Sequence, residues 1–199
     1  GGDTETTVVV ATHAGTVHAL DASDGTFRWQ ATIEPATSDM ATENSVLFPV
    51  AFDGQRVYVS ANDGSLTVLD ATSGEHERCL HSPEWFDWAY HATPTVANGT
   101  VYYNTRLGLT AYDPTTGEEQ WDDTPRIKHN LVYEPVVTDD AVLASGPSTP
   151  VYAFDRKTGE LRWESGGYAL VLSVVDGNFY MSAGGAATAI DIESGDVLW

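Results

Sequence analysis

The sequence predicts an all-β fold of repeated four-stranded antiparallel sheets, and three observations support this prediction. A nine-residue frame, Asp-x-x-x-Gly-x-x-x-Trp, recurs along the 199 residues. A short strand pattern precedes each copy, and its last residue before the Asp is always large and apolar. Hairpin turns such as Asp53-Gly54 and Asn98-Gly99 stand further upstream, each followed by a Val-Tyr-like segment. A repeat of this kind takes precedence over single motifs in predicting the fold.

The five copies of the frame supply the residues that we expect to hold the sheets together. The Asp ends a strand, because its carboxylate can accept backbone N–H groups of the turn that follows. The Gly suits the left-handed residue that completes a three-residue hairpin loop. The Trp returns on the next strand, where an indole covers roughly 150–250 Å² of a neighbouring sheet. The predicted docking residues are Asp21, Gly25, Trp29, Asp70, Gly74, Asp113, Gly117, Trp121, Asp155, Gly159, Trp163, Asp191, Gly195 and Trp199.

The copies differ in completeness. The second copy has Arg78-Cys79 where the Trp is expected. The first copy offers strands over 8–12, 17–20 and 26–29 but lacks the leading strand of the others, which are each expected to have four. Four short strands repeated every roughly 40 residues are typical of a β-propeller with one sheet per blade. The predicted blade repeats in this single propeller segment, 1–199, are 8–30 (partial), 46–80, 93–122, 134–164 and 172–199.

These residues carry a family resemblance. The frame G-x-L-x-x-L-D-x-x-x-G-x-x-x-W, nearly complete at Gly64–Gly74, resembles the repeat of pyrroloquinoline-quinone (PQQ) propellers. The same repeat occurs in non-catalytic relatives such as the outer-membrane-protein assembly lipoprotein of bacteria. The resemblance covers essentially the whole chain and implies rings of seven or eight blades, so four blades and a partial fifth are expected to form part of a ring. The alternative, a closed five-bladed ring, would need the polar, Gly-rich residues 1–7 as a closing strand.

Composition narrows the function. The formal charge of −20 comes from 29 acids against 9 bases, and only Lys128 and Lys157 are lysines. Such an excess suits a salt-adapted protein, since salt screens the repulsion; the alternative is an ordinary acidic protein. Nucleic acid is not expected as a partner, because no extended basic surface exists. The sequence contains no apolar run of the ~20 residues that a spanning helix needs. The chain starts with Gly1-Gly2 rather than Met, and we expect that an upstream segment was removed and that the protein lies outside the cytoplasm.

Departures from the repeat indicate where a site is expected. Three connections between blades are long: Gln30–Ser45, Leu80–His91 and Asp122–Tyr133. The second is rich in aromatics, which form either a wedge between blades or an exposed platform, and its carboxylates Glu84 and Asp87 would also suit a sugar. The third carries a positive spot that receives an anionic group or pairs with nearby acids. The candidate binding face comprises Trp85, Trp88, Tyr90, His91, Arg106, Arg126, Lys128, His129 and Tyr133.

The sequence contains no nucleophile elbow, zinc-protease motif, phosphate-binding loop or EF-hand loop. His76, Cys79 and His81 suggest zinc, but one cysteine cannot supply the paired spacing of structural zinc sites, so no metal is expected. The resembled dehydrogenases hold PQQ against a disulfide of adjacent cysteines, with calcium on Glu, Asn and Asp, and this chain has no cysteine pair. We therefore expect a non-catalytic scaffold without cofactor that binds a protein or small ligand. The alternatives are a fragment of a PQQ-dependent dehydrogenase, with PQQ and calcium, and a carbohydrate-binding propeller.

The acidic composition makes a testable prediction about salt. We expect the melting temperature to rise as monovalent salt goes from tens of millimolar to molar, because screening weakens the repulsion among 29 acids. Thermal melts followed by circular dichroism at increasing NaCl concentration measure this effect. A melting temperature that stays flat or falls over that range contradicts the salt-adapted interpretation.

Overall fold

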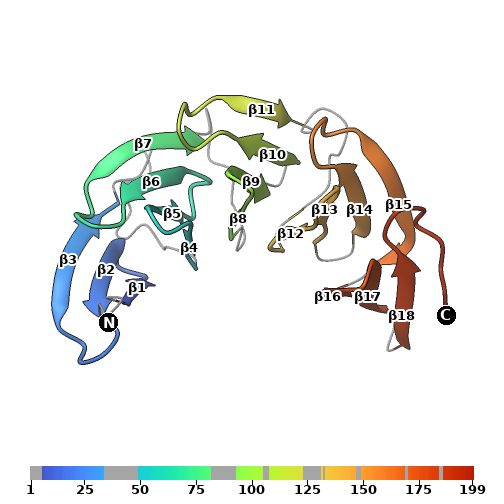
Figure 1. The fold of residues 1–199 in the computed structure, drawn as a ribbon, viewed down its shortest axis with the longest axis horizontal. Helices are drawn as coiled ribbons and strands as arrows, with labels where there is room; N and C mark the ends of the chain where they lie inside the picture. The colour runs from blue at the N-terminus through green and yellow to red at the C-terminus, as the bar shows by residue number, and fades with distance from the viewer. Residues whose placement is uncertain are drawn as a thin grey trace, which may run out of the picture. The chain divides into compact units, whose positions relative to one another are not determined.

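The computed structural model (Figure 1) describes residues 6–33, 49–81, 93–104, 108–122, 131, 133–146, 149–168, 170–183 and 186–199. The chain divides into two compact units, residues 1–89 and 90–199, and each is described by itself. Every named element in the described residues is a strand, so the predicted all-β class is confirmed. Each strand pairs antiparallel with the strand that follows it in its sheet.

The first unit contains two sheets. In the described residues the first sheet has three strands, in the order β1-β2-β3, as the sequence predicted for this partial copy. The second sheet has the full four strands in the order β4-β5-β6-β7. The strands are β1 (Thr7–Ala11), β2 (Thr16–Asp21), β3 (Phe27–Thr32), β4 (Ala51–Phe52), β5 (Arg56–Ser60), β6 (Leu66–Asp70) and β7 (His76–His81).

The second unit contains three sheets, of which the first two have four strands and the last has three. In the last sheet the returning segment is short: it pairs through an isolated bridge between Ile190 and Val197. The strands are β8 (Thr95–Ala97), β9 (Thr100–Asn104), β10 (Leu109–Tyr112), β11 (Glu119–Asp122), β12 (Val136–Val137), β13 (Ala141–Ala144), β14 (Pro150–Asp155), β15 (Leu161–Tyr168), β16 (Leu170–Val175), β17 (Asn178–Ala183) and β18 (Ala186–Asp191).

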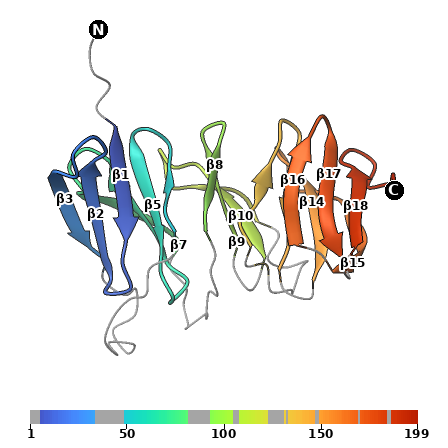
Figure 2. The same ribbon diagram turned by 90° about the horizontal axis from the view of Figure 1, so that it is seen from below.

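The up-and-down order of the strands places the turns of every sheet at its two opposite ends (Figure 2). The word edge is used below for one of these two ends, and not for an outer strand. In a four-stranded meander, the turn between the first and second strands and the turn between the third and fourth lie at the same edge. We call this the corner edge, because the Asp of each frame lies there. The turn between the second and third strands and the connection to the next sheet lie at the opposite edge, called the loop edge. Of the predicted binding residues, Tyr133 is described, and it lies in the connection between β11 and β12 at the loop edge.

The middle sheet of the second unit is covered on both faces, which explains the continuous apolar runs in the sequence. All four residues of β13, Ala141–Ala144, are buried. Val142 and Phe154 pack against Tyr102 and Trp121 of the preceding sheet. Leu143 and neighbouring small residues pack on the other face against the last sheet of the unit. Alternate residues of one strand therefore serve two different interfaces.

The frame tryptophans join consecutive sheets within each unit. The indole N–H of Trp29 donates to the carbonyl of Ala71 in the next sheet at 2.9 Å. Trp121 donates in the same way to Arg156 at 3.0 Å, and Trp163 to Ile192 at 2.9 Å. The acceptor is in each case the residue that follows the Asp of the next frame. The Trp of one copy thus recognises the hairpin corner of the copy after it.

The frame glycines have two physical reasons to lack a side chain. Gly74 has a φ of 74°, in the left-handed region that costs other residues backbone strain. A Cβ at Gly74 would also lie 2.5 Å from the ring of Trp29, and one at Gly159 would lie 2.6 Å from Trp121. The corner of the first copy, at Gly25, has a φ of 75°, but a Cβ there would have nothing within 4 Å. The two requirements are therefore separable within the first unit.

The loop that ends in this glycine is one residue longer than the three predicted. Asp21 N–H donates to the carbonyl of Thr26, which leaves four residues between them, and Gly25 N–H donates back to the Asp21 carbonyl at 2.9 Å. The pairing register shifts just before the Asp, between Ala19 and Leu20. The bulge and the four-residue loop together form the corner.

Gly25 and Gly74 provide a matched test of the contact between a frame Trp and the next corner. We expect Gly25→Ala to cost about 1–2 kcal/mol through its left-handed backbone. Gly74→Ala should cost about 1–3 kcal/mol more, because its methyl group overpacks the indole of Trp29. Urea denaturation of both variants measures the two free energies of unfolding. Equal losses would show that the glycine is required for its backbone conformation alone.

Candidate functional site

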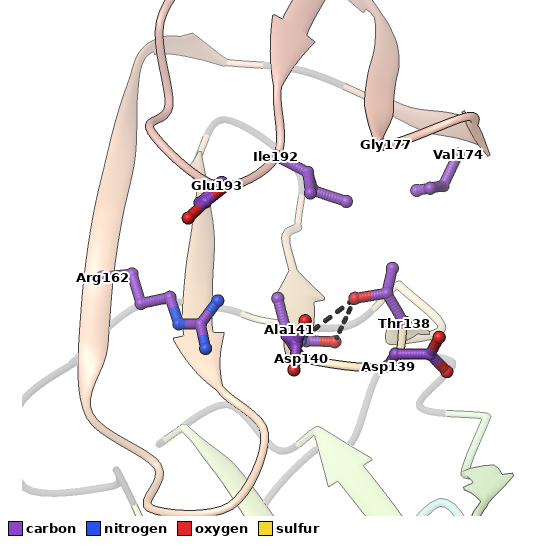
Figure 3. Close-up of a pocket in the computed structure, with 9 residues that line it drawn as sticks. All are labelled: Thr138, Asp139, Asp140, Ala141, Arg162, Val174, Gly177, Ile192 and Glu193. Atoms are coloured by element: carbon purple, nitrogen blue, oxygen red, sulfur yellow. Dashed lines mark hydrogen bonds between the residues drawn. The ribbon is translucent and has the colours of Figure 1, made fainter.

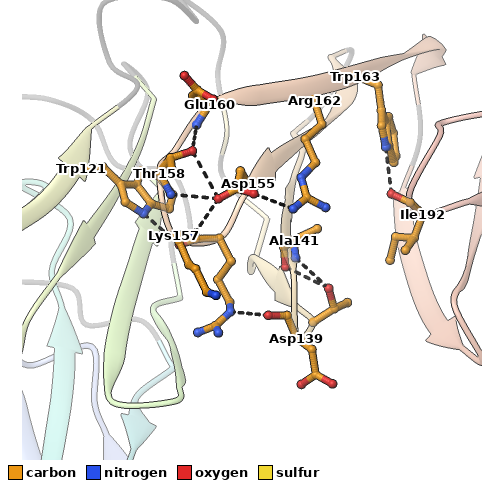
Figure 4. A network of polar contacts seen from close by, with 12 residues as sticks. Trp121, Asp139, Ala141, Asp155, Lys157, Thr158, Glu160, Arg162, Trp163 and Ile192 are labelled. Carbon is orange, nitrogen blue, oxygen red and sulfur yellow. Dashed lines mark hydrogen bonds and ion pairs between the residues drawn. The ribbon is translucent and has the colours of Figure 1, made fainter.

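The corner carboxylates are committed to the turns that they begin. In the fourth sheet, Asp155 accepts hydrogen bonds from the backbone N–H groups of Lys157 and Thr158, both at 2.9 Å (Figure 4). Its second oxygen forms an ion pair with Arg162 at 2.5 Å. The hydrogen bond from Arg162, followed by those from the turn, holds the pKa of Asp155 well below its usual range. This carboxylate is therefore a structural anion rather than a proton donor.

The same arrangement recurs in other copies. Asp70, Asp113 and Asp191 each accept backbone N–H groups from the two residues at the turn centre. Asp21 accepts hydrogen bonds from Ser23 and from Arg28, and these lower the pKa of its carboxyl group. The acids of the frame thus support the predicted docking role, and none of these corner carboxylates is left over for catalysis.

The residue seven positions after the Asp lies on the returning strand and reaches the strand two positions away in its own sheet. Arg28 donates to Thr7 at 3.0 Å, and the Gln120 amide oxygen accepts from Thr100 at 3.1 Å. The second copy uses opposite charges for the same link, because Arg56 donates to Glu77 at 2.8 Å. The fourth copy differs again and is described next.

Arg162 occupies this position in the fourth copy, where Ala141 stands opposite. Ala141 pairs with Asp155 in the register in which Thr7 pairs with Asp21, so the two positions are equivalent. A methyl group cannot accept a hydrogen bond, so the guanidinium lacks a cross-strand link of the kind that Arg28 makes. It borders a cleft instead (Figure 3).

This cleft lies at the corner edge between the fourth and fifth sheets and has a volume of about 790 Å³. Its walls combine the apolar side chains of Val174 and Ile192 with exposed acids. Asp139, Asp140 and Glu193 supply three carboxylates, whereas the charge of Arg162 is already paired with Asp155. The electrostatics therefore favour cations over anions. The full lining is Thr138, Asp139, Asp140, Ala141, Arg162, Val174, Gly177, Ile192 and Glu193.

An equivalent cleft of about 470 Å³ lies in the first unit, between the first and second sheets. Arg28, Gly54, Ala71 and Thr72 occupy the positions that Arg162, Gly177, Ile192 and Glu193 occupy in the second unit. Threonines replace the carboxylates here, so this cleft is not acidic. Sequence reasoning missed both clefts. The sequence feature that could have indicated the clefts is the residue before the frame Trp, Arg28 or Arg162, considered together with the residue opposite it across the sheet.

Most of the predicted binding face lies outside the described residues: Trp85, Trp88, Tyr90, His91, Arg106, Arg126, Lys128 and His129. Tyr133 is described, and its backbone links two sheets at the loop edge. The side-chain amide of Asn104, at the end of β9, donates to the Tyr133 carbonyl at 2.6 Å. Tyr133 N–H in turn donates to the carbonyl of Ser145, just after β13, at 3.1 Å.

Polar atoms are buried without partners at this edge. In the part of the chain that the structure describes, Asn104 Oδ1, Ser145 Oγ and Ser65 Oγ are buried and have no hydrogen-bond partner. Asn104 ends β9 and Ser145 follows the end of β13, which are the second strands of consecutive sheets, and both residues belong to the chain of bonds through Tyr133. Buried unpaired polar atoms are costly, so each calls for an additional donor or acceptor. The sequence did not single out these residues.

The residues considered for zinc do not meet as a cluster. Among the described residues there is no group of three or more His, Cys, Asp and Glu side chains arranged to hold a metal ion. Cys79 donates instead to the carbonyl of His81 in its own strand, at 2.9 Å. The described residues also contain no helix long and apolar enough to cross a membrane.

Comparisons with known proteins relate the whole chain to one family. A family model described as outer membrane protein assembly factor BamB matches residues 1–199. BamB of Yersinia pestis is 27% identical over 216 residues, which cover 98% of this chain and 54% of that protein. The crystal structure of BamB from Moraxella catarrhalis superposes with a TM-score of 0.76 at 23% identity, covering 99% of this chain and 58% of that one. The chain thus spans about half the length of these relatives.

An enzyme is also related. The quinohemoprotein alcohol dehydrogenase ADH-IIG of Pseudomonas putida is 32% identical over 118 residues, which cover 53% of this chain and 16% of that protein. The structural similarity establishes the β-propeller fold that the repeat predicted. The fold is shared by assembly factors and dehydrogenases and does not decide between them.

Proposed function

Because the chain belongs to the PQQ-repeat family described as outer membrane protein assembly factor BamB, we propose that it is a non-catalytic propeller scaffold. It binds a protein partner, or a ligand, at the loop edge of its sheets. The observation that carries the proposal is the match of the assembly-factor family over all 199 residues. The relatives' printed description points to protein partners and to a location outside the cytoplasm, and the acid excess points to a salt-adapted organism.

The use of the frame residues supports a scaffold. Corner carboxylates bind their own turns, and Trp29, Trp121 and Trp163 bind the next corner. The most repetitive part of the sequence is therefore occupied with holding sheets together, which leaves recognition to the segments that differ between copies. Those segments are the long connections at the loop edge.

The loop edge has the chemistry for a partner with both apolar and polar groups. The connection at 80–91 offers Trp85, Trp88 and Tyr90, and such aromatics are the side chains that most often dominate protein interfaces. The unpaired Asn104 Oδ1 can accept a hydrogen bond from a partner, and the Ser145 hydroxyl can donate one. The basic group Arg126, Lys128 and His129 would meet acidic side chains.

The second candidate is a fragment of a PQQ-dependent dehydrogenase, and the identity to the alcohol dehydrogenase of Pseudomonas putida favours it. The single cysteine, Cys79, excludes a disulfide of adjacent cysteines in this chain. The frame carboxylates at the corner edge are committed to their own turns, and among the described residues no group of three or more His, Cys, Asp and Glu side chains is arranged to hold a metal ion. The scaffold therefore explains more of the chain.

A titration distinguishes the two candidates. We expect no heat of binding when PQQ is titrated into the purified chain with Ca²⁺ in a calorimeter, and no dye-linked oxidation of alcohols or sugars. A family dehydrogenase with its cofactor site intact, tested in the same buffer, is the positive control. Stoichiometric binding of PQQ would reject the scaffold assignment in favour of the dehydrogenase.

A pair of tryptophan variants tests the proposed binding face. Trp163→Ala should cost about 3–5 kcal/mol, the usual loss for a large packed aromatic. Trp88→Ala should cost far less, because a ring that forms an exposed platform has little packing to lose. The midpoints of urea denaturation compare the two variants directly. If both variants lose the same stability, the connection at 80–91 is a structural wedge and not a binding platform.

A further inference from the structure

The turn between β8 and β9 carries the one asparagine of the sequence that is followed by glycine, Asn98-Gly99. It is a two-residue hairpin turn, since Ala97 and Thr100 pair across it. Both turn residues lie in the left-handed region, with φ values of 52° for Asn98 and 76° for Gly99. Asn-Gly is the dipeptide that such a hairpin turn favours. The turn therefore has a structural reason to carry a chemically sensitive pair.

Neither reacting group of this pair is held by a hydrogen bond. In Asn-Gly, the backbone nitrogen of the glycine can attack the side-chain carbonyl carbon of the asparagine, because glycine has no side chain in the way. Among the residues that the structure describes, no group bonds to the side-chain amide of Asn98 or to the N–H of Gly99. Both residues are exposed, and a Cβ built at Gly99 would meet nothing within 4 Å. Solvent thus reaches both groups.

Two other described asparagines show the contrast. Asn104 is fully buried, and its side-chain amide donates to the carbonyl of Tyr133 at 2.6 Å. Asn178 begins β17, and the residue that follows it, Phe179, is large and fully buried. A held amide or a bulky following residue hinders the attack. Asn98 has neither protection.

We propose that Asn98 is a site of spontaneous deamidation. The nitrogen of Gly99 bonds to Cγ of Asn98, the bond from Cγ to the amide nitrogen breaks, and ammonia leaves a cyclic succinimide. Water then opens the ring at either carbonyl. Cleavage of the new bond gives aspartate, whereas cleavage of the original peptide bond gives isoaspartate, whose main chain runs through the former side chain. Either product adds one negative charge to the formal −20.

The last sheet contains a template for the aspartate product. Asp176-Gly177 forms the turn between β16 and β17, with φ values of 48° and 75°. The residues that flank this turn pair across it, as do those that flank Asn98-Gly99. The two turns therefore share one conformation. An aspartate at position 98 fits the turn without a change of backbone.

The isoaspartate product does not fit, because it lengthens the main chain of the turn by one atom. The length of a hairpin turn fixes the register of its strands. β8 has only three residues, so it has little pairing to keep it in place. Its Thr95 donates to the carbonyl of Pro135 in the next sheet at 2.7 Å, and its Ala97 packs against the core cluster that contains Trp121. Loosening β8 therefore weakens the contact between the third and fourth sheets.

The test incubates the purified chain at neutral and at mildly alkaline pH and follows each asparagine by mass spectrometry. Cleavage after Arg78 and Arg106 releases one peptide that contains both Asn98 and Asn104, and tandem fragmentation distinguishes the two. We expect Asn98 to lose its amide while Asn104 keeps its own. The loss is faster at the higher pH, because the attacking nitrogen must give up its proton.

The chain unfolded in urea provides the rate that the Asn-Gly sequence has without the fold. An Asn98 that keeps its amide in the folded chain overturns the proposal. If Asn98 reacts only in urea, the hairpin turn protects it rather than exposing it. A loss at Asn104 that equals the loss at Asn98 overturns the proposal as well, because the reaction would not depend on the turn.

Two variants connect the reaction to stability. Asn98→Asp carries the aspartate product from the start and should melt like the fresh wild type. Asn98→Gly retains a dipeptide that this turn accepts but has no amide, so its thermal melt should not change on incubation. The isoaspartate fraction of the incubated wild type, separated by chromatography, should melt at a lower temperature than the aspartate fraction. Equal melting of the two fractions would overturn the inferred loosening of β8.

Discussion

The contact of an indole with a glycine is the interaction on which the other contacts between sheets depend. The Trp ring can approach the corner backbone only because the residue there has no Cβ, and the approach aligns its N–H with the carbonyl after the Asp. The contact places an apolar surface and a hydrogen bond at the same point. It therefore fixes which face of one sheet meets the next and aligns the apolar side chains behind it.

The corner carboxylate makes that contact possible by shaping its acceptor. Asp155 orders the turn through two backbone N–H groups and fixes Arg162 beside it, so the carbonyl of Arg156 is held in position for Trp121. The Arg156 guanidinium also donates to the carbonyl of Asp139, which ties the neighbouring turn to the corner. The charged residues of the corner edge serve mainly to position backbone.

The contact between each frame Trp and the next corner could be predicted because the residues of the frame are close in sequence and recur at a fixed spacing. The clefts could not, because they depend on pairs such as Arg162 and Ala141, which come together only through strand register. The same holds for Asn104 and Ser145, whose unpaired atoms become apparent only once Tyr133 bridges the two sheets. The aromatic connection at 80–91 was conspicuous in composition, but composition does not place a side chain.

Each frame with a Trp carries both the residue that docks on the next sheet and the corner that receives a Trp. This arrangement has an evolutionary consequence. Each copy with a Trp carries its own acceptor glycine and its own donor, as at Gly159 and Trp163, so a duplicated copy arrives with matching ends. A gene could therefore gain or lose one whole copy by unequal recombination without a compensating change in its neighbours. Propellers assembled in this way are free to change their number of blades while the loop edge of each blade diverges independently.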